Sequence, residues 1–547
     1  MNKKVCSFPI LFALLTLLIG TCAGVFPASA QAAPTSTGSI TVSGTVASSY
    51  DAYQIFSANV VDGDSDAKIA TDLAWASDAA RDAVLPVLHS AGMPNSQTTA
   101  QEAAEWLNTD SHLTSALSAQ LARSLQSSDS VSVALNAGKT AELPCGYWLI
   151  VADDDAIAQG EAGTAPIMAL VGGSAVTVKP KAATPKVAKH VLEDSTAAWQ
   201  KAADATVADD LYWRLSATVP AGLTAYDTYT VQFVDTMSAG LDPSKVAASM
   251  CVYVAAGADG GFDAVTCEGG NANSTLAKGW TDITSQCRVS VDGKTFTVRT
   301  GDLIAALGGA DTFTAGARVV AVYNAPLNSA CNHGIAKGNP NEVYLRYPRS
   351  PFADQSGDAG FTRTPSDDAC AYTWGLSLIK RSSSDDKPLA GAKLRIIDDS
   401  GRILTTDGSW STDADACVTT GADGHVELTG ADADVYTVEE IAAPKGYTAF
   451  GGKRTVTVTA EGLDVKQVAA AKPKVTVSVE SPLRVDAADA GTGSIELSVL
   501  NTPSKEVSRG FMPSTGDRTL VLVAALAAIG VAAIVAAFVI KRGGGRR

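Results

Sequence analysis

The sequence is poor in the residues on which most enzyme and nucleic-acid sites depend. Among 547 residues there are 5 histidines, and 42 lysines and arginines stand against 57 acidic residues, so the formal net charge is -15. A phosphate backbone selects for basic protein faces, and this balance therefore excludes nucleic acid as a partner. No HExxH, GxSxG, phosphate-loop or dinucleotide fingerprint stands out, and no C-x-x-C pair marks a zinc or redox site. We expect no enzyme, no cofactor and no metal centre.

The N-terminus has the composition of a secretory signal. Two lysines precede an apolar run from Ile10 to Ile19, and Ala28-Ser29-Ala30 supplies the small-residue pattern that a signal peptidase cleaves. We expect residues 1–30 to be removed and Gln31 to become the first mature residue. The protein is therefore predicted to be secreted.

The C-terminus carries a long apolar segment followed by cations. Leu520–Ile540 contains no charged residue, and as a helix rising about 1.5 Å per residue it is long enough to span a bilayer. Residues 541–547 hold four lysines and arginines, which favour the cytoplasmic side. An ordinary single-span membrane protein is the simplest interpretation.

A motif just before this segment favours a different interpretation. The pentapeptide Met512-Pro513-Ser514-Thr515-Gly516 resembles the LPXTG sorting signal of Gram-positive bacteria, with Met512 in place of leucine. The resemblance implies that a sortase, a membrane cysteine transpeptidase, cleaves between Thr515 and Gly516 and passes Thr515 to an amine. Pro513 suits this chemistry because it disfavours helix before it. Residues 504–519 then form a linker and sorting motif, and the membrane holds the protein only before sorting.

Removal of both ends leaves an acidic, β-rich chain. Its formal charge falls to -21, because the lost segments carry a net six positive charges. We predict an N-terminal domain at 31–178, a middle domain at 179–366 and a C-terminal domain at 367–503. Apolar spacings of mostly four between Asp72 and Leu125 predict helical insertions in the first domain. Short strands separated by turns predict a β-sandwich in the third.

Several segments together resemble the backbone pilins of Gram-positive bacteria, the shaft subunits of sortase-assembled pili. In the third domain, Leu378-Ile379-Lys380, the glutamate box within Tyr436–Tyr447, and Leu500-Asn501-Thr502-Pro503 follow one another in the family's order. The resemblance implies a mainly β protein of tandem immunoglobulin-like sandwiches of the collagen-adhesin B-type, prealbumin-like fold. It also implies covalent cross-links, because members of this family form intramolecular isopeptide bonds.

The resemblance assigns Lys380, Glu440 and Asn501 to such a bond in the third domain. Burial between two sheets disfavours charge, so it lowers the pKa of a lysine and raises that of a carboxylic acid. A neutral Lys380 then attacks the side-chain carbonyl of Asn501, Glu440 donates to the carbonyl oxygen, and ammonia leaves. Neighbouring strands hold the reactants at high effective molarity.

In the middle domain, the resemblance assigns Lys189 as nucleophile and Asp235 as the acid that handles protons. Where the family usually has Tyr-Ser-Asn, this chain reads Tyr347-Pro348-Arg349, so the expected acceptor is missing. Asn341 and Asn324 remain as alternative acceptors on a shifted strand. Without such a bond, a disulfide is the alternative covalent lock.

The mature chain retains an odd number of cysteines, seven, and an oxidising compartment favours disulfides between them. Four lie between Cys251 and Cys331, which favours a local pairing there, but the connectivity stays open. The candidate residues are Cys251, Cys267, Cys287, Cys331, Cys370 and Cys417.

The segment Val176–Lys181 resembles the pilin motif, usually Tyr-Pro-Lys, whose lysine attacks the sortase-bound threonine of the next subunit. Lys181 is the first candidate and Lys179 the second, and the alternative is a linker with solvated lysines.

The resemblance thus implies a structural subunit of a covalently polymerised cell-surface pilus. Its partners are sortase, neighbouring pilin subunits and the peptidoglycan precursor. The alternative is a cell-wall-anchored monomeric adhesin, or a pilus tip or base subunit, that binds a host surface protein or glycan.

Overall fold

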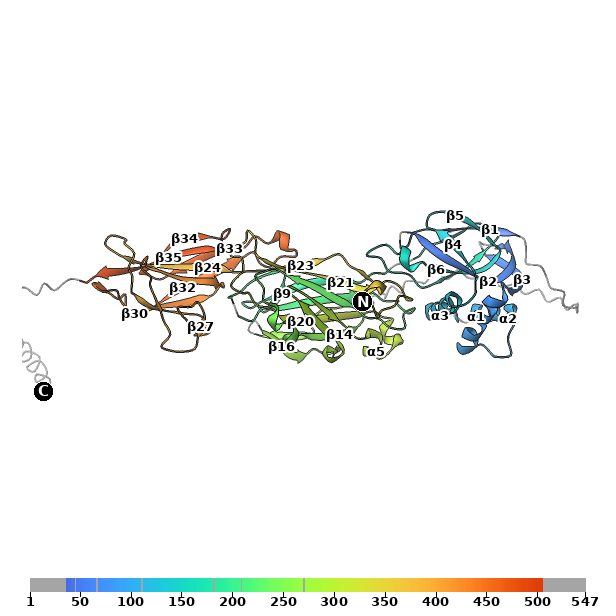
Figure 1. Cartoon of the computed structure of the whole chain (residues 1–547), viewed down its shortest axis with the longest axis horizontal. Coiled ribbons are helices and arrows are strands. Elements are labelled where there is room, and N and C mark those ends of the chain that lie inside the picture. The colour runs from blue at the N-terminus through green and yellow to red at the C-terminus, as the bar shows by residue number, and fades with distance from the viewer. Residues whose placement is uncertain are drawn as a thin grey trace, which may run out of the picture.

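The computed structural model describes residues 36–504, apart from residue 45 and residues 65–66, 110–111, 181–182, 208 and 269–270; side chains of 266–274 are also left undescribed. The signal segment, Lys181, the sorting motif Met512–Gly516, the apolar segment 520–540 and the tail 541–547 lie outside the described residues. Within the described part, no helix has both the length and the apolar character needed to cross a bilayer. The described residues form a first, a middle and a third domain in a row (Figure 1).

The first domain is built from two small sheets. Its strands are β1 (Thr37–Val42), β2 (Ser49–Asp62), β3 (Lys68–Trp75), β4 (Ser132–Asn136), β5 (Thr140–Pro144), β6 (Gly146–Ala152), β7 (Ile167–Val171) and β8 (Val176–Val178). One sheet has the order β5-β1-β8, and the other has the order β3-β2-β6-β7 with β4 also paired to β2.

Helices enter this domain between β3 and β4, as the sequence predicts. They are α1 (Asp78–Ser90), α2 (Ala100–Asn108) and α3 (Ser115–Gln126). Ser77, Thr99 and Thr114 cap them by accepting hydrogen bonds from first-turn amides. The helical region begins at Asp78 rather than Asp72, because the preceding residues pair with β2 as β3.

The middle domain is a larger sandwich. Its strands are β9 (Lys186–Glu193), β10 (Ala198–Gln200), β11 (Ala202–Asp204), β12 (Tyr212–Val219), β13 (Gln232–Met237), β14 (Cys251–Ala256), β15 (Val265–Glu268), β16 (Asn271–Leu276), β17 (Trp280–Asp282), β18 (Arg288–Asp292), β19 (Thr295–Arg299), β20 (Ala317–Asn324), β21 (Asn339–Pro348), β22 (Phe361–Arg363) and β23 (Asp367–Tyr372). Short helices are α4 (Val246–Ser249), α5 (Leu303–Ala306) and α6 (Ala310–Phe313).

One sheet of this sandwich has the order β10-β9-β12-β20-β14-β17. The other has the order β11-β23-β21-β13-β19-β18, with β22 on β21, and β15 and β16 form a separate hairpin. Residues from both sheets, including Trp213, Phe233 and Leu345, form one buried cluster. Any polar side chain that points into this cluster is removed from water.

The third domain is a sandwich whose first and last strands are neighbours. Its strands are β24 (Trp374–Ser382), β25 (Lys393–Ile397), β26 (Ile403–Leu404), β27 (Trp410–Ser411), β28 (Val418–Thr419), β29 (His425–Ala431), β30 (Val435–Ala442), β31 (Tyr447–Thr448), β32 (Lys453–Glu461), β33 (Lys474–Val479), β34 (Leu483–Asp489) and β35 (Ser494–Pro503). One sheet runs β29-β24-β35-β31 with β34 on β35. The facing sheet runs β27-β26-β25-β30-β32-β33 with β28 on β25.

The boundary predicted at residue 367 needs correction. Residues Asp367–Tyr372 form β23, which pairs with β21 and β11 of the middle domain. The third sandwich therefore begins with β24 at Trp374, and Thr373 alone separates the two strands.

Contacts fix the first domain against the middle one. Arg123 on α3 forms an ion pair with Asp227 at 2.8 Å and lies over the ring of Phe352, 5.6 Å from its centre. Tyr347 donates a hydrogen bond to the carbonyl of Gly160 at 2.8 Å. The helical side of the first domain and the end of β21 thus belong to one junction.

Two contacts hold the junction between the middle and third domains. Arg402 forms a bidentate pair with Asp209, with distances of 2.7 and 2.6 Å. In the second contact, the backbones of Gly334 and Gly493 meet so closely that a Cβ at Gly334 would lie 2.3 Å from Gly493 N. Both glycines have positive φ, 69° and 70°. A side chain at either position is therefore disfavoured both by the close contact and by the backbone conformation.

Buried carboxyl groups also meet at this junction. Asp204 accepts hydrogen bonds from Trp374 Nε1 at 2.9 Å and from Ala433 N at 3.0 Å, and its carboxyl is hydrogen-bonded to that of Asp432. Glu193 accepts from Asp204 N at 3.2 Å. Burial, followed by the mutual repulsion of these acids and of nearby Asp194, raises the pKa of Glu193 to about 7 and that of Asp432 well above its usual range. The acids are thus protonated more readily in the folded protein than in the unfolded chain.

The junction should therefore weaken as the pH rises. Stability is lost as the pH rises from the ordinary carboxyl pKa of about 4 through the raised values of the folded state. We expect the thermal unfolding midpoint to fall between pH 5 and pH 8, and Asp432→Asn to flatten this dependence because an amide does not ionise. Calorimetry of the mature chain across this range tests the expectation. A variant whose midpoint falls as steeply as that of the wild type would contradict it.

Candidate functional site

The residues assigned in the third domain come together in its core. Lys380 lies on β24 and Asn501 on β35, and these neighbouring strands run parallel with Ser382 opposite Asn501. Glu440 reaches them from β30 in the facing sheet. Lys380 is fully buried, Asn501 is 1 % exposed and the Glu440 side chain is fully buried. The first and last strands of the domain thus carry the two potential reactants.

Glu440 connects the lysine and the amide directly. Its Oε1 atom lies 3.2 Å from Lys380 Nζ and accepts a hydrogen bond from Asn501 Nδ2 at 2.7 Å. Its Oε2 atom accepts from Phe450 N at 3.0 Å. Lys380 Nζ also lies 5.0 Å from the centre of the Phe450 ring. A single carboxyl oxygen therefore contacts both the nucleophile and the leaving group of an amide exchange.

The electrostatics of this site favour a reactive amine. Burial lowers the pKa of Lys380 to about 8, and the attraction of Glu440 opposes this shift only in part. At that value about a tenth of the amine is neutral at pH 7. The side-chain oxygen of Asn501 is buried and finds no hydrogen-bond partner among the described residues. It is the oxygen on which negative charge would develop when the amine attacks.

The middle domain contains a second buried site of this kind. Lys189 on β9 and Asp235 on β13 are in direct contact, and Asn341 on β21 lies beside them; all three are fully buried. Asn341 is next to Asp235 because β13 and β21 pair with Met237 opposite Asn341. The sheet that carries Lys189 faces the sheet that carries the other two. An amide bond here would tie the two sheets together.

Tyr323 on β20 completes this second site. Its hydroxyl accepts hydrogen bonds from Lys189 Nζ at 2.8 Å and Asn341 Nδ2 at 2.9 Å, and it donates to Asp235 Oδ2 at 3.1 Å. The sequence reasoning missed this residue. The alternation of β20 could have revealed it, since Val319, Ala321 and Tyr323 share one buried face.

Charge is disfavoured throughout the second site. Burial lowers the pKa of Lys189 to about 8, and burial raises the pKa of Asp235 against the opposing pull of the lysine. Both shifts favour the neutral amine and the protonated acid. The ring centres of Trp213 and Tyr323 lie 5.3 and 5.4 Å from Lys189 Nζ.

The other candidate acceptors lie elsewhere. Asn324 uses its side chain to bind Asp210 at 2.6 Å and the amide of Leu211 at 3.1 Å. Arg349, at the position where the family usually has asparagine, lies past the end of β21 and donates to the carbonyl of Asp154 in the first domain at 3.2 Å. Of the two asparagines left open by the sequence, the geometry favours Asn341.

Only one of the two candidate polymerisation lysines can be located. Lys179 is exposed directly after β8, and Lys181 lies outside the described residues.

The predicted disulfides are not present among the described cysteines. The cysteines with free thiols are Cys145, Cys251, Cys287, Cys331, Cys370 and Cys417. Cys370 is buried on β23 whereas Cys417 lies in the third sandwich, so separate domains hold them. The side chain of Cys267 is outside the described set.

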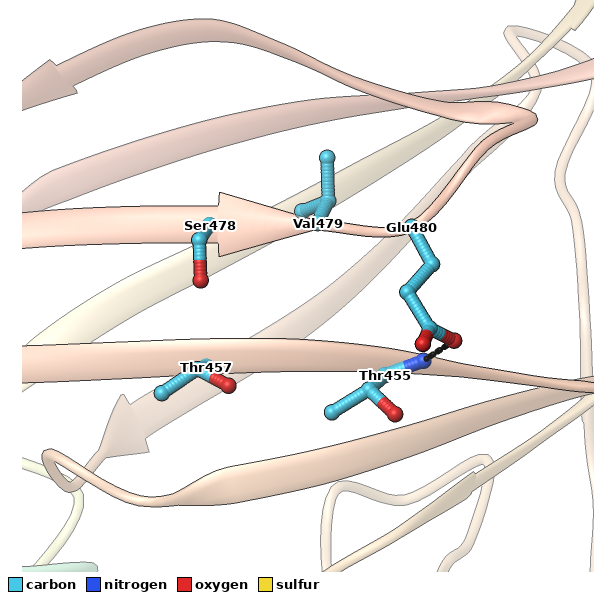
Figure 2. Close-up of a pocket in the computed structure, with 5 residues that line it drawn as sticks. All are labelled: Thr455, Thr457, Ser478, Val479 and Glu480. Carbon is cyan, nitrogen blue, oxygen red and sulfur yellow. Dashed lines mark hydrogen bonds between the residues drawn. The ribbon is translucent and has the colours of Figure 1, made fainter.

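The third domain also has a shallow depression on its surface. Figure 2 shows its lining residues on β32 and at the end of β33: Thr455, Thr457, Ser478, Val479 and Glu480. Its volume is about 250 Å³. The Glu480 carboxylate already accepts a hydrogen bond from Thr455 N at 2.9 Å. These groups do not form a reactive constellation comparable with the two buried lysine sites.

Part of the third domain is similar to a known domain family. Residues 375–472 match the family model of the SpaA prealbumin-like fold domain. Over 134 residues the chain is 28% identical to the trypsin-resistant surface T6 protein of Streptococcus pyogenes serotype M6. This match covers 23% of each protein, so it spans less than a quarter of the relative's length.

Similar solved structures include pilin subunits. The T6 backbone pilin of serotype M6 Streptococcus pyogenes is 15% identical, with a TM-score of 0.46, over 86% of this chain and 98% of that one. The full-length major pilin SpaD from Corynebacterium diphtheriae is also 15% identical, with a TM-score of 0.41 and the same two coverages.

Substitution of the two candidate acceptors, Asn341 and Asn324, can show which of them reacts with Lys189. We expect Asn341→Ala to prevent loss of ammonia from the middle domain, so that the mature chain is heavier by one ammonia than expected for the substitution alone. Asn324→Ala should lose as much ammonia as the wild type, since its side chain does not contact Lys189. Intact-mass spectrometry measures both, and the reverse pattern would identify Asn324 as the acceptor.

Proposed function

We propose that this protein is a structural subunit of a covalently polymerised cell-surface pilus. The signal at 1–30 directs secretion, sortase cleaves between Thr515 and Gly516, and Thr515 is joined to a lysine of the next subunit. The observation that carries the proposal is the buried group of Lys380, Glu440 and Asn501, on strands of a domain that matches the prealbumin-like model. Covalent cross-links would help the subunits of such a fibre to resist unfolding, because they stabilise a domain without requiring a large hydrophobic core.

The internal bond of the third domain forms by amide exchange. The neutral amine of Lys380 attacks the side-chain carbon of Asn501, and Glu440 protonates the amide and then accepts the proton lost by the amine. The new bond joins Nζ to the carbonyl carbon, and the old carbon–nitrogen bond breaks to release ammonia. Glu440 is positioned for this role by its contacts with both nitrogens.

Such a bond suits the strand arrangement of the third domain. Because β24 and β35 are parallel neighbours, tension applied at Trp374 and at Pro503 would shear one strand past the other. A covalent link from Lys380 to Asn501 passes that force directly from the first strand to the last. The chain between them is then bypassed, and unfolding under force, which depends on the unfolding rate, is suppressed.

The proposed partners are sortase, neighbouring subunits and the peptidoglycan precursor, and the proposed location is the bacterial surface. The internal bonds form by self-catalysis, so the protein is not an enzyme toward other molecules. The alternative of a monomeric wall-anchored adhesin differs in one respect, because it does not polymerise.

The internal bond of the third domain can be tested by substitution of its nucleophile. We expect Lys380→Met to retain one ammonia and to lower the free energy of unfolding by about 4–5 kcal/mol, as for the opening of a closed loop of roughly 100 residues. Intact mass and denaturant unfolding of the mature chain measure the two effects. The control is Lys393→Met on an exposed face of the same domain. Unchanged mass in Lys380→Met relative to that control would refute the bond.

Polymerisation can be tested in the producing cell. We expect cell-wall extracts to contain a ladder of high-mass species that disappears in Thr515→Ala and in Lys181→Ala, with Lys179→Ala as the matched comparison. Immunoblotting after wall digestion measures it. Loss of the ladder only in Lys179→Ala would move the linkage to Lys179. A single band in the wild type would favour the monomeric adhesin.

A further inference from the structure

The two buried lysine sites differ in how the acid reaches the amide. In the third domain, Glu440 contacts both the lysine and the asparagine. In the middle domain the acid is aspartate, one methylene shorter, and the described contacts connect it to Asn341 only through the hydroxyl of Tyr323. The tyrosine oxygen therefore occupies the role that a carboxyl oxygen has in the third domain.

We propose that Tyr323 is a catalytic residue of the middle-domain cross-link, and that it carries the proton between Asp235 and the leaving nitrogen of Asn341. The inference rests on the proposed isopeptide chemistry and adds a fourth participant to it. Tyr323 is fully buried and hydrogen-bonded to both reacting nitrogens and to the acid. General acid–base groups at such distances act in the transition state of proton transfer.

The proton transfers balance with Tyr323 as the relay. As neutral Lys189 Nζ attacks the side-chain carbon of Asn341, the hydrogen bonds of Tyr323 to Asp235 and to Asn341 reverse direction. Protonated Asp235 gives its proton to the tyrosine oxygen, and Tyr323 gives its own proton to Asn341 Nδ2. Asp235 then accepts the proton that the attacking nitrogen loses. One carbon–nitrogen bond forms, one breaks, ammonia leaves, and both Tyr323 and Asp235 return to their starting states.

The surroundings favour a relay over a stable tyrosinate. Burial and the proximity of Asp235 raise the pKa of Tyr323 well above its usual value, so the hydroxyl keeps its proton until it is replaced. Two buried oxygens, Asp235 Oδ1 and Asn341 Oδ1, have no hydrogen-bond partner among the described residues. A proton on Asp235 provides one of the donors that this site lacks.

The test is Tyr323→Phe in the mature chain, which keeps the ring that packs on Phe296 with centroids 4.8 Å apart. Wild type should lose two ammonia molecules, one per site, and Tyr323→Phe should lose one promptly while the middle bond forms about 10²–10⁴-fold more slowly. Intact mass against time measures the rate, and proteolytic fragments show which domain is cross-linked. The third-domain bond in the same molecule confirms folding and intact chemistry there.

Two further variants separate catalysis from a structural effect. Tyr347→Phe removes another buried, hydrogen-bonded hydroxyl from the same domain and should cross-link at the wild-type rate. Adding Asp235→Glu to Tyr323→Phe lengthens the acid by the missing methylene and should restore the middle bond. A pH profile of the slow reaction in Tyr323→Phe should differ from that of the double variant.

The outcomes separate this inference from the proposed function. Two ammonia molecules lost by Tyr323→Phe at the wild-type rate would overturn the role of Tyr323 and leave the cross-links in place. A wild-type protein that keeps the middle ammonia would overturn the middle cross-link itself, and the inference with it. If Tyr323→Phe does not fold, the double variant decides: a folded double variant without the bond contradicts the relay.

Discussion

The burial of a lysine against an acid and an amide is the constraint on which both larger sandwiches depend. Removing a charged ammonium from water into a sheet–sheet core costs several kcal/mol, and an ion pair regains this only with excellent geometry. Lys189 and Lys380 are both fully buried, and burial moves the pKa of each down to about 8. A neutral amide in the same place carries no such cost. The unreacted lysine sites are therefore the less stable state of the core, and the proposed reaction would remove the buried charge.

The two buried lysine sites differ in how their residues are distributed over the sheets. In the third domain, nucleophile and acceptor lie on neighbouring strands of one sheet, and the acid crosses from the facing sheet. In the middle domain, Lys189 and Tyr323 belong to one sheet while Asp235 and Asn341 belong to the other. A bond in the first arrangement would protect parallel strands from shear, and a bond in the second would hold two sheets together. The same proposed chemistry would thus reinforce the two sandwiches in different directions.

The sequence predicted the third site more fully than the middle one, for a physical reason. Lys380, Glu440 and Asn501 each lie in a recognisable segment, so motif order alone brings them together. Asn341 could be recognised as an acceptor only from the register of β21. Alternation along this strand puts Asn341 and Tyr347 on the same inward face, but it does not show how deeply each side chain is buried. The position at Arg349 was misleading because the strand has ended there and the chain has entered the junction with the first domain.

The junction acids lay beyond sequence reasoning altogether. Asp204 and Asp432 are separated by more than two hundred residues and meet only because two domains pack against each other. No local pattern distinguishes them from exposed acids in a chain with 57 acidic residues. The helical insertions, by contrast, could be predicted because the spacing of apolar residues along a helix is a local feature of the sequence.

The distribution of buried lysines also agrees with the path of force in the proposed fibre. If the threonine of one subunit is joined to Lys179 or Lys181 of the next, tension enters between the first and middle domains and leaves beyond Pro503. It then crosses the middle and third sandwiches, each with a buried lysine site, and bypasses the first domain. Among the residues described in the first domain, no lysine is buried. The proposed covalent reinforcement would thus lie where the load passes, whereas the described part of the first domain offers no such site.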